Sequence, residues 1–257
     1  KYRCCHLKRF VGGGMRENKQ IGGFYMKVLN YGSLNVDYVY SVDHIIVGGE
    51  TQHSSKLEVF SGGKGLNQSI ALAKAGVPVY HAGIVGTDGD ILLEACKEAG
   101  VNTKYIRRLP VKGGHTMIQV DKNAQNCIIL YGGTNQMQTK EFVDEVLADF
   151  GEGDYLMLQN EINMLDYIID QAYEKKMKIV MNPSPFDDKL STCDLSKVYL
   201  FLVNEIEGEQ ITGCKDKDQI LDAMAARFPN ARFVLTLGSD GAVYYDGKEK
   251  VFQDIFK

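Results

Sequence analysis

Short apolar runs alternate along most of the chain with segments in which apolar residues recur every three or four positions. The runs have the length of strands, and the periodic segments have the pattern of amphipathic helices. This alternation predicts a mainly parallel central sheet with helices on both faces. The predicted strands are Val28 to Tyr31, Val79 to Ile84, Tyr155 to Leu158, Ile179 to Met181, Leu200 to Val203 and Phe233 to Leu237; the predicted helices are Leu66 to Ala75, Ile91 to Ala99, Lys140 to Phe150, Leu165 to Lys175 and Gln219 to Phe228.

Two stretches break this alternation. Tyr38 to Phe60 and His115 to Tyr131 have the pattern of strands joined by polar turns, with no helix between them. Together they predict a second, small sheet of about four strands that projects from the main one. A sheet of this size needs packing against another surface to be stable.

One loop is rich in glycine and leads directly into a predicted helix. It has the sequence Ser61-Gly62-Gly63-Lys64-Gly65-Leu66-Asn67-Gln68. Its glycines allow the backbone to approach a polar ligand closely, and the start of the helix is expected to direct free N–H groups at that ligand. Neither standard nucleotide pattern fits this loop. The pattern G-x-x-x-x-G-K-[ST] is absent, and Gln68 stands where G-x-G-x-x-G needs its third glycine. By itself the segment is also compatible with an ordinary turn between a strand and a helix.

Polar side chains also follow the first predicted strand. Asn35 and Asp37 are two positions apart in Gly32-Ser33-Leu34-Asn35-Val36-Asp37, a spacing that places both on one side of an extended chain. A carboxylate and an amide on the same side can hold adjacent hydroxyls of a sugar. The alternative is that both residues only form a turn after the strand.

These two segments, G-S-x-N-x-D and G-G-K-G-x-N-Q, together resemble the ribokinase branch of the PfkB carbohydrate kinases. The resemblance extends from Lys27 to about Phe252 and implies a ribokinase-like three-layer α/β sandwich. In that family a small β-sheet lid closes over the sugar; here it would comprise residues 38–60 and 115–131, within a domain spanning 26–257. Further matching segments are Gly83 to Asp88, Gly132 to Asn135, Leu158 to Glu161, Asn182 to Pro185, Asn204 to Glu207 and Thr236 to Gly241.

The resemblance implies a set of sugar-binding residues: Asn35, Asp37, Gly63, Lys64, Asn67 and Glu161. Some of these have a local alternative role. Asn67 could cap its helix, Lys64 could be a solvated loop charge, and Glu161 could cap the following helix.

The family also implies a nucleotide site for ATP with Mg²⁺. The nucleotide-binding residues would be Asn182, Asn204, Thr236, Gly238 and Gly241, and Glu207 would order the metal together with Asn204. Magnesium keeps several waters, so few protein ligands suffice. Val203 stands where the family usually has proline. The alternative for Glu207 is one of several exposed acidic residues on a helix.

One family element is missing from this sequence. Family members carry D-T-x-G/A-A-G-D, whose glycine turn forms the anion hole and whose last aspartate is the catalytic base. Neither Gly-Ala-Gly-Asp nor Ala-Ala-Gly-Asp occurs in the 257 residues, so no catalytic residue is assigned. The same part of the family fold supplies a monovalent-cation site. The resemblance therefore predicts a kinase that phosphorylates a sugar hydroxymethyl group, most simply that of ribose, with little or no activity in this chain.

Three alternatives to a ribose kinase stay open. The chain could be an inactive sugar-binding or regulatory homologue, or it could act on another sugar or a nucleoside. A dinucleotide-dependent oxidoreductase is disfavoured because no G-x-G-x-x-G follows the first strand.

Composition narrows the possible partners and location. A net charge of -4 and a pI of about 5.8 argue against binding to nucleic acid or to an anionic membrane. No apolar run approaches the roughly 20 residues of a membrane helix, which predicts a cytoplasmic protein. Residues 1–25 lack periodicity and are expected to be a disordered extension outside the family domain. The resemblance further implies a homodimer formed through the lid.

Overall fold

The computed structural model describes residues 26–255, and the predicted extension over residues 1–25 lies outside the described residues. The described chain divides into two compact units. Unit 1 contains residues 26–31 and 139–255, and unit 2 contains Gly32–Gln138. Each unit is described by itself below.

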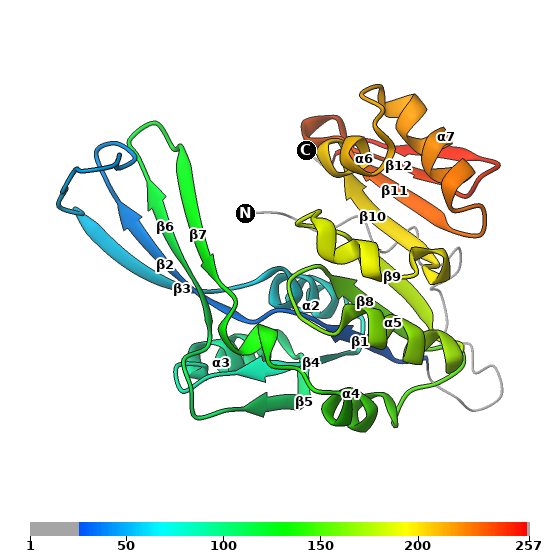
Figure 1. Ribbon diagram of the computed structural model, residues 1–257, viewed down its shortest axis with the longest axis horizontal. Helices are drawn as coiled ribbons and strands as arrows, with labels where there is room; N and C mark the ends of the chain where they lie inside the picture. The colour runs from blue at the N-terminus through cyan, green and yellow to red at the C-terminus, as the bar shows by residue number, and fades with distance from the viewer. Residues whose placement is uncertain (1–25, 256–257) are drawn as a thin grey trace. The chain divides into compact units, whose positions relative to one another are not determined.

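Unit 1 is built on strands that are mostly parallel. Their order is β13-β12-β11-β10-β9-β8-β1, in which the pairs from β1 to β11 are parallel and β12 and β13 are antiparallel (Figure 1). The central strands are buried on both faces, as expected for parallel strands covered by helices. The strands are β1 (Val28–Tyr31), β8 (Tyr155–Gln159), β9 (Lys178–Asn182), β10 (Leu200–Asn204), β11 (Arg232–Thr236), β12 (Ala242–Tyr245) and β13 (Lys250–Gln253).

Helices pack on these strands around an aromatic core. The rings of Phe201 and Phe233 are stacked with centroids 6.0 Å apart, and Phe228 lies 4.8 Å from Phe201. Both Phe201 and Phe233 are fully buried, so these rings contribute strongly to the packing of β10 and β11. The helices are α4 (Lys140–Leu147), α5 (Leu165–Glu174), α6 (Glu205–Thr212) and α7 (Lys217–Arg227), with short 3-10 turns η2 (Asp188–Thr192), η3 (Leu195–Lys197) and η4 (Gly238–Asp240).

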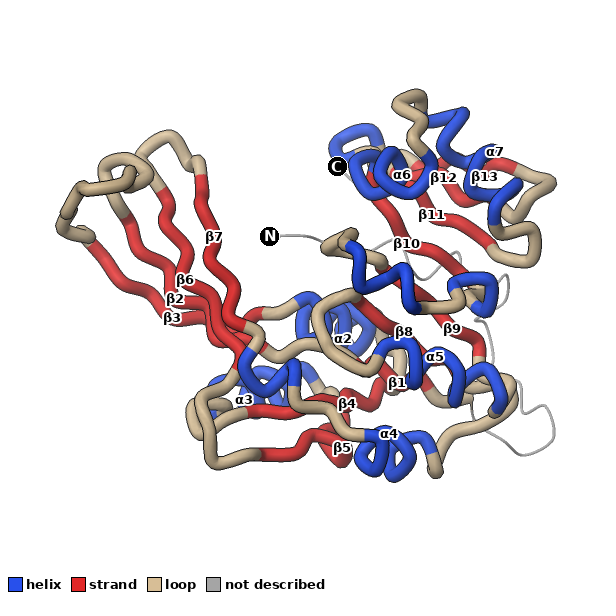
Figure 2. Tube along the Cα trace, viewed as in Figure 1, coloured by secondary structure: helices blue, strands red, loops and turns tan. Residues whose placement is uncertain are grey.

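Unit 2 contains a parallel strand pair with two helices and a separate sheet of four strands. The order of that sheet is β3-β2-β6-β7, with β2 and β6 parallel in the middle (Figure 2). We call this sheet the lid. Its strands are β2 (Asn35–Ser41), β3 (Lys56–Gly62), β6 (Gly114–Val120) and β7 (Asn126–Tyr131); the other elements are α2 (Lys64–Lys74), β4 (Val79–Val85), α3 (Asp90–Ala99), β5 (Asn102–Arg108) and η1 (Gly133–Gln136).

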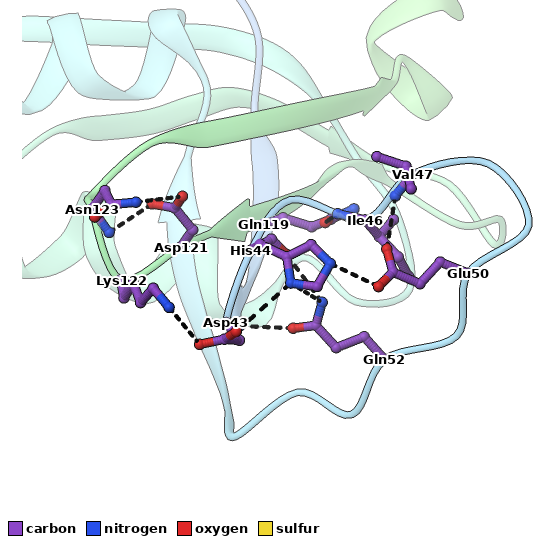
Figure 3. A network of polar contacts seen from close by, with 10 residues as sticks. All are labelled: Asp43, His44, Ile46, Val47, Glu50, Gln52, Gln119, Asp121, Lys122 and Asn123. Carbon is purple, nitrogen blue, oxygen red and sulfur yellow. Dashed lines mark hydrogen bonds and ion pairs between the residues drawn. The ribbon is translucent and has the colours of Figure 1, made fainter.

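Polar contacts join the two loops at the tip of the lid (Figure 3). His44 Nε2 lies 2.7 Å from Oε1 of Glu50 within the loop that follows β2. Lys122, in the turn between β6 and β7, donates to Asp43 at 3.2 Å. The tip is therefore held by side-chain contacts between the two hairpin ends.

The mixed α/β fold with a mainly parallel sheet and a smaller sheet is confirmed. The predicted strands and helices of the alternating pattern agree with the observed ones to within two residues, apart from α4, which ends at Leu147 rather than Phe150. The elements β5, β12, β13 and α6 were not predicted. In β5 only Tyr105 is buried, so the strand lacks a clear apolar pattern. Among the described residues, no helix combines the length and apolar character needed to cross a membrane.

Candidate functional site

The start of α2 rests on the turn that follows β1. Ser33 is fully buried; its Oγ accepts from the Gly65 N–H at 3.2 Å and its carbonyl accepts from the Leu66 N–H at 3.0 Å. Both N–H groups are thus bonded within the protein. The prediction that this helix start offers free N–H groups to a ligand is therefore wrong for Gly65 and Leu66. Ser33 was not assigned a role from the sequence, although the Gly-Ser turn was part of the motif.

Glycine is required where the loop and the turn meet. Gly63 is the N-cap of α2 and has φ 94°, a left-handed conformation that favours glycine. A Cβ on Gly65 would overlap the backbone of Ser33. Because α2 begins at Lys64, Asn67 lies inside the first turn and is exposed. The alternative that Asn67 caps the helix is therefore wrong.

Asn35 and Asp37 both lie in β2, so the alternative that they only form a turn is wrong. Asn35 is 3% exposed, and its Oδ1 accepts from Nδ2 of Asn135 at 2.7 Å. Asn135 in turn accepts from the Leu34 N–H at 3.0 Å. The Asn35 amide is thus part of a buried pair. A Cβ on Gly114 would overlap both amides, so glycine is needed there.

Asp37 is half-buried and lies beside the glycine loop. Its Oδ1 accepts from Oγ1 of Thr116 at 2.7 Å, across the parallel register of β2 and β6. Its carboxylate covers Gly62, where any Cβ would overlap it. The structure thus brings Asp37 next to the Gly62-Gly63 segment. The role of Thr116 had no signal in the sequence, because a threonine in a strand is common.

A buried histidine connects α2 to the same turn. His81 Nδ1 lies 2.7 Å from Oγ of Ser69 in α2, and its Nε2 lies 3.3 Å from the carbonyl of Gly32. Burial lowers the pKa of His81 from its ordinary value of 6.5 to about 4, although the hydrogen bond to Gly32 opposes this shift. The ring is therefore neutral at physiological pH and acts as a fixed hydrogen-bonding bridge.

The other assigned residues lie in unit 1, most of them at the carboxyl ends of adjacent strands. Asn182, Asn204 and Thr236 are the last residues of β9, β10 and β11. Ligands of open α/β sheets bind beyond such strand ends. Gly238 and Gly241 both have positive φ, and a Cβ on Gly241 would overlap the backbone of β13.

Several of these side chains already have local partners. Asn182 Nδ2 donates to the carbonyl of Leu202 at 2.9 Å. Glu161 precedes α5, but the N-cap of that helix is Met164 and makes no side-chain cap, so the capping alternative for Glu161 is not observed. Glu161 and Lys64 lie in different units.

Asn204 and Glu207 form a capping box at the start of α6. Asn204 Oδ1 accepts from the Glu207 N–H at 2.8 Å, and Glu207 Oε2 accepts from the Asn204 N–H at 3.0 Å. Glu207 is only 7% exposed, so its alternative reading as an exposed acidic residue is wrong. Within residues 26–255, no cluster of three or more His, Cys, Asp or Glu side chains could hold a metal. Asn204 and Glu207 carry oxygen donors, the type of ligand that magnesium takes together with waters.

Comparison with known proteins identifies the family. The sequence profile described as pfkB family carbohydrate kinase matches residues 26–257. The chain belongs to this family. It is 30% identical over 235 residues to the ribokinase of Haemophilus influenzae, covering 86% of this chain and 76% of the relative. It is 31% identical over 232 residues to the ribokinase of Staphylococcus aureus, covering 88% and 74%.

Solved structures of the family agree. The crystal structure of ribokinase from Cryptococcus neoformans in complex with ADP superposes with a TM-score of 0.75 at 28% identity, covering 91% of this chain and 80% of that one. The carbohydrate kinase assignment and the resemblance to the ribokinase branch are thereby confirmed. The individual binding residues are not tested by these comparisons and stay predictions.

The neutral state of His81 predicts a pH dependence of stability. Between about pH 6.5 and pH 4 the unfolded chain binds a proton at His81 that the folded chain does not, so the free energy of unfolding falls as the pH falls. The contribution is present in full above pH 6.5, and about 3 kcal/mol is lost towards pH 4. Urea unfolding of the wild type and of His81→Asn, at about pH 7 and about pH 4.5, should show a smaller fall in the variant.

The matched control is His53→Asn, at an exposed histidine in the lid loop. Its unfolding free energy should follow the wild type at both pH values. An equal fall for His81→Asn and the wild type would contradict the assignment of a buried neutral His81.

Proposed function

We propose that the chain binds ribose through the residues around Asp37 in unit 2 and binds ATP with Mg²⁺ through the strand ends of unit 1. The observation that carries the sugar assignment is the position of the Asp37 carboxylate over Gly62, oriented by Thr116. An ionised carboxylate has about four lone-pair directions, so it can accept from sugar hydroxyls while it accepts from Thr116. The names of the two bacterial relatives favour ribose among the sugars.

The remaining sugar-binding residues have different roles in this proposal. Gly63 allows the glycine loop before α2 to approach the Gly32-Ser33 turn closely. Asn35 contributes through its buried hydrogen bond with Asn135, and it exposes little of its side chain to a ligand. Lys64 and Asn67 supply further polar contacts to the hydroxyls, and Glu161 keeps the sugar-binding role that the family resemblance gives it. Another sugar or a nucleoside stays an alternative, because hydroxyl-binding groups of this kind serve all of them.

The nucleotide part of the proposal rests on the strand ends and on the relative with ADP. Asn182, Asn204 and Thr236 end three adjacent parallel strands, and Gly238 and Gly241 shape the turn that follows. Glu207 would hold Mg²⁺ through water, because Oε2 already accepts from the backbone. Magnesium would neutralise charge on the phosphates, and phosphoryl transfer otherwise depends on positioning. In the family, the part that carries D-T-x-G/A-A-G-D also supplies a monovalent-cation site. This motif does not occur in the 257 residues, so no residue is proposed for such a site.

Asp37→Ala should abolish ribose binding and leave the binding of an ATP analogue nearly unchanged. Each charged hydrogen bond lost to the sugar is worth about 1.5–3 kcal/mol, so the loss of two such bonds should lower the affinity at least about 100-fold. Isothermal titration calorimetry with ribose and with the nucleotide measures both affinities. The matched control is Glu58→Ala, which removes a carboxylate from the same face of the lid, where Glu58 pairs with Lys56 at 2.7 Å. Unchanged ribose affinity in Asp37→Ala would contradict the sugar assignment.

We expect these 257 residues to phosphorylate ribose very slowly, because they contain no Gly-Ala-Gly-Asp turn. General base catalysis contributes roughly 10² to 10⁴ in rate, and a preorganised anion hole adds a comparable factor. A coupled ADP-release assay should compare the chain with a fusion to a segment that carries such a turn. Ordinary turnover by the chain alone would show that another residue serves as the base. Ribose binding by the fusion without turnover would instead suit the alternative of a sugar-binding homologue.

We further propose that two copies pair through the lid. All six side chains of β7 are exposed, including Ile128 at 54% and Ile129 at 62%. An apolar strand of this kind is typical of a surface that a partner covers. Sedimentation velocity should detect a dimer that Ile128→Lys/Ile129→Lys converts to a monomer, whereas Val47→Lys in the lid loop should stay dimeric. A wild-type protein that sediments as a monomer at all concentrations would contradict the pairing.

A further inference from the structure

The turn between β4 and α3 contacts the segment that leads into β6. Asp88 Oδ1 accepts from the Gly113 N–H at 2.9 Å, and the Thr87 N–H donates to the carbonyl of Val111 at 2.9 Å. Any Cβ on Gly86 would overlap Gly113. This close backbone contact fixes the position at which the chain enters the lid.

Lys112 extends the same contact to the neighbouring strand. Its Nζ lies 2.7 Å from Oδ2 of Asp88, donates to the Tyr38 hydroxyl at 3.0 Å, and lies 5.2 Å from the centre of the Tyr38 ring. Tyr38 in turn packs edge-on against His115, and His115 Nδ1 lies 3.1 Å from the carbonyl of Gly113. These contacts form a closed ring that joins β2 and β6 at their base.

Simple stabilisation of α3 does not account for Asp88. The N-cap of α3 is Gly89, and this helix start has no side-chain cap. The Asp88 carboxyl is instead directed to groups at the base of the lid. Burial acts to raise its pKa, but the hydrogen bonds from Lys112 and Gly113 outweigh burial, so the pKa is lowered and the group is charged.

The ring of contacts lies close to Asp37 along the chain, but on the opposite face of the lid. Tyr38 follows Asp37 in β2, so the two side chains point to opposite faces of the lid. Thr116, which orients Asp37, is three residues after Gly113 in the chain. Gly113 and Tyr38 are therefore linked through the backbone of β6 and β2 to the two residues, Thr116 and Asp37, that meet on the other face.

We propose that Asp88 and Lys112 are a positioning pair, the Asp88–Lys112 clamp, which holds β2 and β6 in the orientation that presents Asp37 to the sugar. This inference rests on the proposed sugar site. Neither residue is assigned contact with the sugar. Their effect is expected on sugar affinity and on the order of the lid base, with no effect on the nucleotide residues of unit 1.

The test uses Asp88→Asn, Lys112→Met and the double variant in the full chain. Asn keeps an acceptor for the Gly113 N–H, and Met keeps an apolar stem against Tyr38. Each single variant should lower the affinity for ribose about threefold to tenfold. The double variant should bind ribose about as tightly as the weaker-binding single variant, because the effects of two coupled residues do not add. Affinity for an ATP analogue should stay unchanged.

Hydrogen–deuterium exchange supplies a readout that does not depend on a ligand. Exchange should rise in residues 36–39 and 113–116 of the variants. The matched control is Lys122→Met, which removes the ion pair with Asp43 at the tip of the same sheet and should leave ribose affinity and exchange at the base unchanged (Figure 3).

The outcomes separate the clamp from the proposed function. If the wild type binds ribose and the clamp variants bind it equally well, the clamp is overturned. If the wild type binds no ribose, the proposed function fails, and the clamp is then judged by exchange alone: increased exchange at the base supports it and unchanged exchange overturns it.

Discussion

The close contact between the start of α2 and the Gly32-Ser33 turn sets the geometry of unit 2. Gly65 has no side chain, so the helix backbone can lie directly against Ser33, which accepts from the Gly65 and Leu66 N–H groups. His81 contacts the same turn through the carbonyl of Gly32. Because β2 starts two residues after Ser33, these contacts determine where Asn35 and Asp37 lie. The N–H groups at the start of a helix often bind an anion. Here the N–H groups of Gly65 and Leu66 instead help to position β2.

The sequence predicted most of the fold because buried parallel strands leave a strong signal. Runs such as Leu156 to Leu158 are apolar at every position, and the helices between them are periodic. Two of the elements that were not predicted, β5 and α6, have weak patterns. β5 is largely polar, and α6 is a short helix defined by its capping box more than by an apolar face.

The candidate site could be predicted only in part, because a sequence gives residue types and not their partners. The glycine loop and Asp37 were found by their spacing, and the structure brings them together. The roles of Ser33, Asn135 and Thr116 could not be predicted, because they depend on contacts between residues that are far apart in the chain. The hydrogen bond between Asn35 and Asn135 is an example. The capping box of Asn204 and Glu207 shows a further limit: the same two residue types suit a metal site and a helix start.

The order of strands in the lid leaves β3 and β7 as its two edges. The β3 edge carries Lys56 and Glu58, charges of the kind that discourage pairing with another strand. The β7 edge has no charged residue from Asn126 to Tyr131. Within residues 26–255 the outer side of β7 pairs with no further strand. Its backbone is therefore a template for strand addition, which makes newly made chains at high concentration prone to edge-to-edge aggregation.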